Sequence, residues 1–395
     1  MVSSESSFLG FGQQNVKGNP ATFDSVFQYL LFRRSNFGPQ NISIPLGGEV
    51  GGGAVERNVV KVGVTAGGAI EFIPRPDTLG HMFYGVTGQY TAPADPPYNL
   101  HTFDFATDHF SAPYYTVRYS PGGLWGEQYA DCRFNFLSLE WQAANFVTGT
   151  VGLQGITPTK VSTSNWGALA KVDSGPQFLA PKGAIELPTG VSAKVLAGSF
   201  IATAAIPMDQ QFTVGNYYPA GVDITQRAFV LNLTVKITDE DLYEKAQYDP
   251  AQSGAWAANI FKEADFLLNF KSDKTFEDDG AVTRNYEFTI AANGSSGSGA
   301  NVAWTAQPLE LIAQRQVVMQ LQGTFLADPS GNTPLTITLR TDYPTYATAL
   351  AGSWSPSASA SASVSPTPSA SVSPSASESP SESPSGSPSA SASPS

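Results

Sequence analysis

The chain has 395 residues, a formal net charge of −12 at pH 7 and a single cysteine, Cys132. The acidic balance argues against a basic surface that grips nucleic acid, and one cysteine excludes an intrachain disulfide. Only 14% of the residues are charged, whereas glycine, tyrosine and phenylalanine are abundant, which is typical of β structure with many turns.

The first residues indicate an arm ahead of the folded body. Residues 8–22, FLGFGQQNVKGNPAT, carry turn-forming glycine, asparagine and proline, so we expect an arm rather than a buried strand. The sequence start lacks the basic segment and apolar core of a secretory signal. No apolar run approaches the roughly 20 residues that cross a bilayer. We therefore expect no membrane association and folding in a cytoplasm.

A strand and a short helix are the main elements predicted in the first half. Val60, Val62 and Val64 alternate with other residues, which predicts a half-buried strand. Asp77 is then placed to cap a short helix. The apolar residues of this helix form one stripe, Leu79, Met82, Phe83 and Val86. A further strand follows in PYYTVRYS, residues 113–120.

The same order of elements recurs in the second half. An alternating strand at residues 229–236 precedes Thr238, which we expect to cap a helix with an acidic first turn. Strands are again predicted downstream, at residues 265–272 and 285–292, and KTFEDDGAV (residues 274–282) is interpreted as a hairpin tip between them.

Both halves close on alternating segments with the same ending. Residues 132–155 and residues 309–323 each finish on Leu-Gln-Gly. Because the order of elements before these endings is also shared, the sequence indicates a divergent internal duplication.

These patterns predict a mainly β fold with two tandem β-sandwich or β-barrel modules, each flanked by a short α-helix. The first module and its N-terminal arm span residues 1–160. Residues 161–218 supply a linker and the first strands of the second module, which spans residues 219–352. Residues 353–395 are almost wholly serine, proline and alanine, so this tail has nothing to bury and is expected to be disordered.

No constellation of residues indicates catalysis, a metal or a cofactor. His81, His101 and His109 lack the spacing of a metal site, and we expect His81 to pack within the helix or face solvent. The glycine-rich residues 47–53 lack the Lys-Ser/Thr of a phosphate loop and are interpreted as a flexible loop. Cys132 is interpreted as a buried structural thiol.

The second closing segment has two contrasting faces. Strand alternation places an apolar set on one face, which can pack a sandwich core. The opposite face is rich in neutral amides and carries Glu310, Gln314, Gln316, Gln320 and Gln322.

Several stretches together resemble one known family. They are GFGQQNVKGNPATFDSVFQYLLF (residues 10–32), residues 69–90, residues 98–105 with 129–155, residues 308–325 and the last strand PLTITLR. In these stretches and in its two-half plan, the chain from Phe8 to Asp342 resembles the tail tube proteins of long-tailed bacteriophages, in their two-module branch. The resemblance implies a structural virion protein, without enzymatic activity, that is made in the host cytoplasm and stacks as rings into the tail.

The resemblance also implies roles for particular residues. Two modules per chain imply a trimeric ring with pseudo-six-fold symmetry. DNA would slide through a polar bore without specific binding, because fixed cations would hold its phosphates. The implied lumen-lining candidates are Thr148, Thr150, Gln154, Glu310, Gln314, Gln316, Gln320 and Gln322. The implied inter-ring contact candidates are Phe11, Gly12, Gly51, Gly52 and Gly53. The implied partners are further copies of the chain and the tape measure, tail terminator and distal tail proteins.

Two other hypotheses fit part of the sequence. A surface-displayed carbohydrate-binding or adhesion β-sandwich would use the Ser/Pro/Ala segment as a stalk. The missing secretion signal and the repeated strand–helix plan argue against it. A capsid decoration protein would share the virion setting and would differ in its oligomer.

Overall fold

The computed structural model gives a mainly β fold, as predicted. It describes residues 7–21, 27–45, 58–93, 99–105, 111–162, 175–187, 193–237, 261–263, 266–278, 282–292, 302–306, 317–327, 334–343 and 345–347. The chain divides into a first unit, Met1–Trp354, which is compact, and Ser355–Ser395. The predicted tail, residues 353–395, lies outside the described residues. Within the described part, no helix has the length and apolar character needed to cross a membrane.

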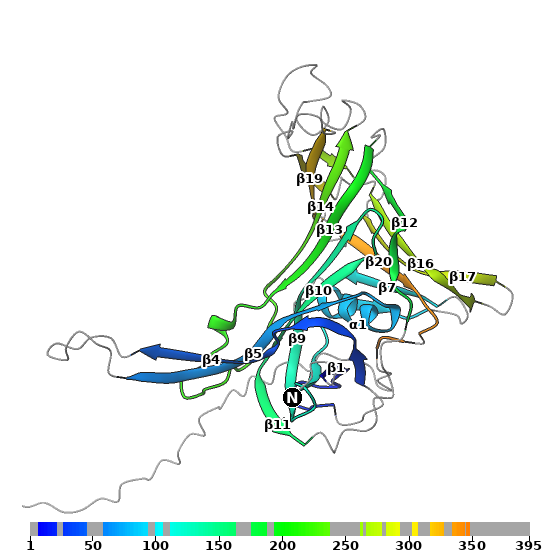
Figure 1. Cartoon of the computed structure of the whole chain (residues 1–395). Helices are drawn as coiled ribbons and strands as arrows, with labels where there is room; N and C mark the ends of the chain where they lie inside the picture. Colours follow the sequence, from blue (N-terminus) through cyan, green and yellow to red (C-terminus); the bar gives the residue numbers. More distant parts are fainter. Residues whose placement is uncertain are drawn as a thin grey trace, which may run out of the picture. The chain divides into compact units, whose positions relative to one another are not determined.

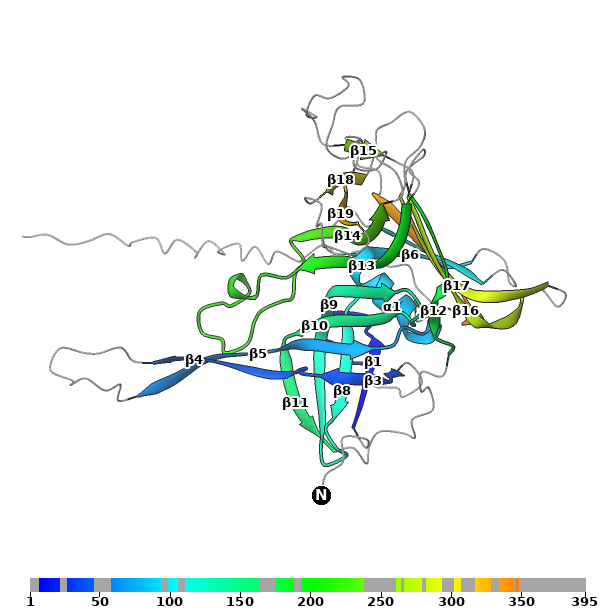
Figure 2. The same cartoon turned by 45° about the horizontal axis from the view of Figure 1, so that its top comes forward.

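A 14-stranded sheet forms one layer of the first unit (Figure 2). Its main path contains, in spatial order, β15 (Phe261–Glu263), β18 (Val302–Ala306), β19 (Val318–Phe325), β14 (Gln226–Ile237), β13 (Ala193–Ala205), β9 (Gly126–Gln142), β10 (Thr148–Gly155), β5 (Val59–Phe72) and β3 (Phe32–Ser35). Off this path lie β4 (Gly38–Pro45), β1 (Phe8–Gln13), β2 (Phe27–Leu30), β8 (Tyr115–Ser120) and β11 (Thr157–Val161). The antiparallel contact of β13 with β9 joins the two sequence halves.

A six-stranded sheet forms the second layer. Its spatial order is β12 (Phe178–Glu186), β16 (Leu267–Asp278), β17 (Val282–Ala292), β20 (Leu335–Arg340), β7 (Leu100–Phe105) and β6 (Gly88–Thr91). The predicted hairpin is confirmed, since β16 pairs with β17 as far as Asp278 and Val282. β20, the last strand, pairs with the first-half strand β7. Both halves thus contribute strands to both sheets.

The helix α1 (Pro76–Thr87) packs between the two sheets, as Figure 1 shows. Its predicted apolar stripe is confirmed, because all four residues are fully buried. The predicted cap is wrong by two residues: Arg75 is the N-cap, and Pro76 occupies the first turn, where its missing N–H costs nothing. Asp77 lies in that turn, and its carboxylate accepts a hydrogen bond of 3.2 Å from the Gly175 N–H.

The two Leu-Gln-Gly endings occupy equivalent places in the large sheet. Residues 153–155 of β10 pair with residues 68–66 of β5. Residues 321–323 of β19 pair in the same way with residues 233–231 of β14. The neighbouring strands correspond as well. In spatial order, β9, β10, β5 and then β3 or β4 match β18, β19, β14 and β13. The strand order therefore contains the internal duplication that the sequence predicts.

Two first-half predictions differ from the structure. The N-terminal segment begins as a buried strand and not as an arm, because β1 inserts between β2 and β8 and buries Leu9 and Phe11. The strand predicted at Val60 is present, but Val60 and Val62 are exposed and only Val64 is buried. The cause is that β4 and β5 form a hairpin that projects from the body (Figure 1). The helix predicted after Thr238 lies outside the described residues.

Candidate functional site

One face of the large sheet carries a row of polar side chains that crosses six strands. The cross-strand register places at successive positions Thr305, Gln322, Asn232, Ser199, Glu140 and Thr148, on β18, β19, β14, β13, β9 and β10. Side chains alternate between the two faces along a strand. Their neighbours Leu231, Phe200 and Leu139 accordingly point the other way and are buried. This face, called the polar face below, therefore carries a continuous polar row with the partly buried Ile201 and Val230 beside it, and the opposite face covers the core.

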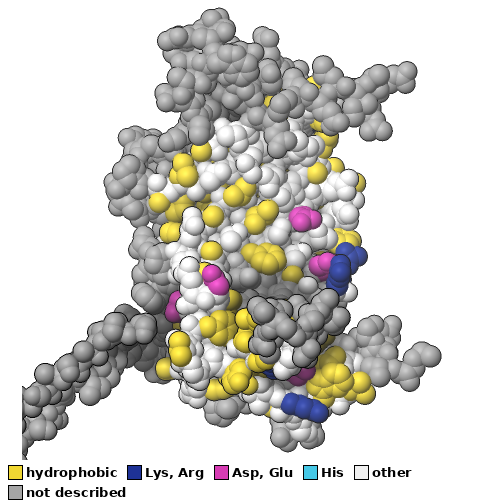
Figure 3. All heavy atoms as spheres, turned by 90° about the vertical axis from the view of Figure 1, so that its left-hand side faces the viewer, with side chains coloured by type: hydrophobic (Ala, Val, Ile, Leu, Met, Phe, Trp, Pro, Cys, Tyr) yellow, Lys and Arg dark blue, Asp and Glu magenta, His cyan; other side chains and the backbone are white. Residues whose placement is uncertain are grey.

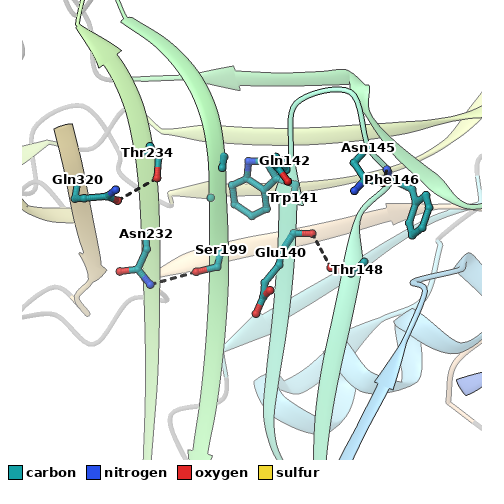
Figure 4. Close-up of a pocket in the computed structure, with 12 residues that line it drawn as sticks. Glu140, Trp141, Gln142, Asn145, Phe146, Thr148, Ser199, Asn232, Thr234 and Gln320 are labelled. Atoms are coloured by element: carbon teal, nitrogen blue, oxygen red, sulfur yellow. Dashed lines mark hydrogen bonds between the residues drawn. The ribbon is translucent and has the colours of Figure 1, made fainter. Parts of the chain in front are cut away.

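Hydrogen bonds link neighbouring side chains along this polar face (Figure 4). The Asn232 amide donates to the Ser199 hydroxyl at 3.2 Å, and the Gln322 amide donates to the Asn232 side-chain oxygen at 3.1 Å. One row away, the Thr234 hydroxyl donates to the Gln320 side-chain oxygen at 3.0 Å. Each amide uses only part of its hydrogen-bonding capacity in these bonds, so further donors and acceptors remain for water.

A shallow depression of about 410 Å³ opens in the middle of the polar face. It lies where β13 carries only the small residues Ala197 and Gly198, between larger side chains of β14 and β9. Its rim includes Gln142, Thr234 and Glu140 (Figure 4). Amides and hydroxyls dominate the lining, so the depression offers hydrogen bonds to water and no nucleophile paired with a base.

Fixed charge is sparse on this face. Glu140 is exposed within the six-strand row, and Glu71 of β5 pairs with Arg34 of β3 at 3.6 Å with both side chains exposed. Lysines occur at the far ends of β13 and β14, where Lys194 and Lys236 are cross-strand partners. Figure 3 shows this side of the molecule, where a few isolated charged groups lie among white polar side chains and backbone and scattered hydrophobic side chains. The central rows are thus wetted and nearly neutral.

The two described histidines, His81 and His101, and the cysteine, Cys132, are buried in the protein interior. The ring nitrogens of His101 lie 2.8 Å from the Tyr90 hydroxyl and 2.9 Å from the Tyr343 carbonyl oxygen. Burial lowers the pKa of His101 to about 4. His81 packs inside an aromatic cluster, and Cys132 is a fully buried thiol whose pKa is raised by burial. Within the described ranges, no three His, Cys, Asp or Glu side chains gather as a metal site.

Five of the eight lumen-lining candidates fall in described strands, and the register brings them onto the polar face. Thr148 and Gln322 belong to the same six-strand row, and Thr150 and Gln320 belong to adjacent rows. Gln154 lies beside Gly67, where any Cβ would meet its side-chain amide at 2.6 Å. The other three candidates, Glu310, Gln314 and Gln316, lie outside the described residues, as does His109.

The polar face also contains residues that were not predicted as candidates. Ser199, Asn232, Thr234 and Glu140 supply much of its centre. The alternation within residues 226–237 carried a signal for Asn232 and Thr234, because these two residues alternate with buried leucines and a valine. Ser199 could not be found in this way, since Gly198 and the small residues around it weaken the alternation of β13.

The inter-ring candidates have different surroundings. Phe11 is 1% exposed and packs edge-on against Tyr115 and Phe134, and Gly12 pairs with Phe27. A contact at these two positions would require β1 to leave the core. Gly51, Gly52 and Gly53 lie outside the described residues, between β4 and β5.

The β4–β5 hairpin exposes an unusual number of aliphatic side chains. The exposed set is Ile42, Ile44, Val59, Val60 and Val62. Ile44 and Val60 are direct cross-strand partners with exposed fractions of 55% and 42%. Such a concentration on one projecting ribbon is typical of a surface that another molecule covers.

A family model described as phage tail tube protein matches residues 47–306, which include strands of both halves. No curated protein matches the chain.

Proposed function

The chain belongs to the phage tail tube protein family, and from this membership we propose that it polymerises as stacked rings into a tail tube that conducts DNA during ejection. It is accordingly a structural protein of the virion tail. The observation that carries the proposal is the six-strand polar row, since a conduit needs one continuous wall that neither repels water nor retains its cargo.

In this proposal the polar face lines the bore. The six-strand row presents amides and hydroxyls with one carboxylate, Glu140, and no cation among the described residues from Thr305 to Thr148. Fixed cations bind DNA phosphates by releasing counterions, so a nearly neutral wall leaves DNA free to slide. The buried face of the same sheet packs on α1 and the small sheet, which would form the outer part of the wall.

The internal duplication supports a ring of three chains with pseudo-six-fold symmetry. Each chain contributes two equivalent sets of strands, β9–β10–β5–β3/β4 and β18–β19–β14–β13, already joined edge to edge by β9 and β13. Three chains would supply six such sets. The wall of each ring would then repeat six times although the ring contains three copies.

Stacking of rings is assigned in this proposal to the β4–β5 hairpin. Its exposed aliphatic residues, with Gly51, Gly52 and Gly53 beyond them in the sequence, would be covered by the next ring. The tape measure, tail terminator and distal tail proteins would be the further partners of the tube, and assembly would take place in the host cytoplasm.

Negative-stain microscopy and native mass measurement of the purified chain test the proposal. We expect rings or tubes, and disassembled rings with a mass of three chains. A six-chain ring would refute the trimer and leave the tube intact. A protein that stays monomeric and binds a carbohydrate array would refute the tube in favour of an adhesion module. Small caps on capsids would indicate a decoration protein.

A further inference from the structure

An apolar pocket of about 230 Å³ opens between the two sheets, next to the turn that joins β9 to β10. The Trp141 ring of β9 and the Phe270 ring of β16 meet in it, with their centroids 5.3 Å apart. Val195 of β13 and Ile185 of β12 add aliphatic walls, and none of the described lining residues carries a charge. We call it the Trp141 pocket. Small-molecule sites usually measure roughly 300–1,000 Å³, so this pocket is better suited to one or two apolar side chains.

Backbone hydrogen bonds hold the rim of the Trp141 pocket in place. The Ala143 N–H donates to the Leu196 carbonyl at 2.8 Å, and the Ala180 N–H donates to the Asn145 carbonyl at 3.0 Å. Ala144 lies between these two anchors and lines the pocket with a φ of 64°, a left-handed conformation that favours glycine over alanine. Such a conformation persists only where its surroundings enforce it. The pocket is therefore preformed in the single chain.

The Trp141 pocket and the β4–β5 hairpin lie at opposite ends of the same strands. Gly149 of β10 pairs with Phe72, the last residue of β5, and with Leu139, two residues before Trp141. Val60 lies at the other end of β5. β5 has 14 residues, so its two ends are roughly 45 Å apart at about 3.3 Å per residue. Figures 1 and 2 both place the hairpin and β12 on opposite sides of the body.

The far part of the hairpin has side chains that fit such a pocket. Ile44 and Val60 are cross-strand partners, 55% and 42% exposed, and β4 contains no charged residue. Nearer the body, the chain covers the hairpin itself, because a Cβ on Gly63 would lie 2.9 Å from the Phe212 ring of the segment after β13. The pair beyond this contact remains exposed and is the part that another molecule can bury.

An apolar patch at one end of a molecule and an apolar pocket at its other end can join head to tail, and such a contact extends into a filament. We propose that the Trp141 pocket receives Ile44 and Val60 from the β4–β5 hairpin of a second copy of this chain in the adjacent ring. This inference rests on the proposed stacking of rings and names the surface that receives the hairpin. The occupant comes from a second copy because, within one chain, the length of β5 separates the two surfaces.

Thiol crosslinking between two different copies tests this contact. Cys132 is the only native cysteine and is fully buried, so a short bismaleimide reaches only engineered thiols. A chain with Ile44→Cys is mixed before assembly with a tagged chain that carries Ala143→Cys at the exposed rim of the pocket. We expect a mixed crosslinked dimer in tubes and none in the unassembled mixture. Leu124→Cys, at a 60% exposed position in the turn between β8 and β9, replaces Ala143→Cys in the matched control and should give no mixed dimer.

A variant that obstructs the pocket provides a second test without crosslinking. Ala143→Trp places a large side chain at the mouth of the Trp141 pocket, at an exposed position where urea unfolding should be nearly unchanged. We expect tubes only at protein concentrations at least tenfold above those of the wild type, because the hairpin can no longer enter. Leu124→Trp is the control for added surface hydrophobicity and should assemble at the wild-type concentration.

The outcomes separate this inference from the proposed function. Tubes in which Ile44→Cys crosslinks only to a second Ile44→Cys, or to no engineered thiol, would overturn the pocket contact and leave the tube proposal standing. Assembly of Ala143→Trp at the wild-type concentration, or equal impairment by Leu124→Trp, would also overturn the pocket contact. Absence of any ring or tube from the unmodified chain would overturn both proposals.

Discussion

The hydroxyl of Tyr346 donates a hydrogen bond of 2.6 Å to the backbone carbonyl of Pro76, 270 positions earlier in the sequence. The Tyr346 ring is fully buried against His101, Tyr343 and the helix α1, where Gly80 leaves room for it. A Cβ on Gly80 would lie 2.4 Å from this ring. The last described residues are thus tied to the first turn of α1, between the two sheets.

Tyr346 should therefore contribute strongly to stability. Tyr346→Phe removes one buried hydrogen bond and leaves the Pro76 carbonyl without this donor, so we expect a loss of about 1 kcal/mol in the free energy of unfolding. Tyr346→Ala also removes the packed ring and should cost about 3–5 kcal/mol. Urea unfolding of the unassembled chain measures both. Tyr217→Phe, at a 61% exposed position, is the control and should change little.

The contact of Tyr346 with Pro76 predicts which C-terminal truncations the protein tolerates. Deletion of Ser355–Ser395 removes none of the described contacts of Tyr346, so we expect unchanged stability and tube growth. Deletion from Tyr343 onward removes the fully buried Tyr346 and the partly buried Tyr343 and should destabilise the body. Thermal unfolding and microscopy compare the two. Failure of the shorter deletion to fold or assemble would show that the Ser/Pro/Ala tail contributes to the body.

The sequence predicted individual strands and the internal duplication better than it predicted which segments are buried and how distant strands are aligned. The spacing of apolar residues predicted β14 and the apolar stripe of α1. Burial on one face places apolar residues at every second position in a strand and about every 3.6 positions in a helix, and this spacing is visible in the sequence. The buried position of β1 was missed, since glycines at 10 and 12 resemble a turn but instead let Tyr29 and Phe27 pack closely against the strand. The six-strand row depends on register between distant strands, which no local pattern contains.

His101 should make stability depend on pH. Its pKa in the folded protein is about 4, below the ordinary value of 6.5, because burial disfavours the charged ring. Between these values the unfolded chain binds a proton that the folded chain does not, so stability falls as pH drops from about 6.5 to about 4 and the loss is complete below that. His101→Gln should flatten this part of the profile. A difference between the two proteins that is independent of pH from 7 to 4 would contradict this assignment.

Charge on the polar face should control passage of DNA. Glu140→Lys places a cation at the centre of the six-strand row, three per proposed ring, at an exposed position where folding should be unaffected. We expect tubes of normal yield that retain DNA at low salt and release it as salt rises. Glu186→Lys, exposed at the end of β12 in the other sheet, is the matched control. Equal DNA retention by both variants would show that Glu140 does not face the bore.

The exposed pair Ile44 and Val60 should act in assembly and not in folding. The two side chains are cross-strand partners on the projecting hairpin, and each keeps more than a third of its surface in water. Replacing both by serine removes apolar area that only a neighbouring molecule could bury, at about 25 cal/mol per Å². The unassembled variant should therefore unfold at nearly the wild-type urea concentration. Its tubes should be fewer or should need a higher protein concentration to form. Val282→Ser, at a 44% exposed position at the start of β17, controls for a general change in surface hydrophobicity. If the double variant assembles at the wild-type concentration, the hairpin is not the stacking surface, and the rings must be held together by other residues.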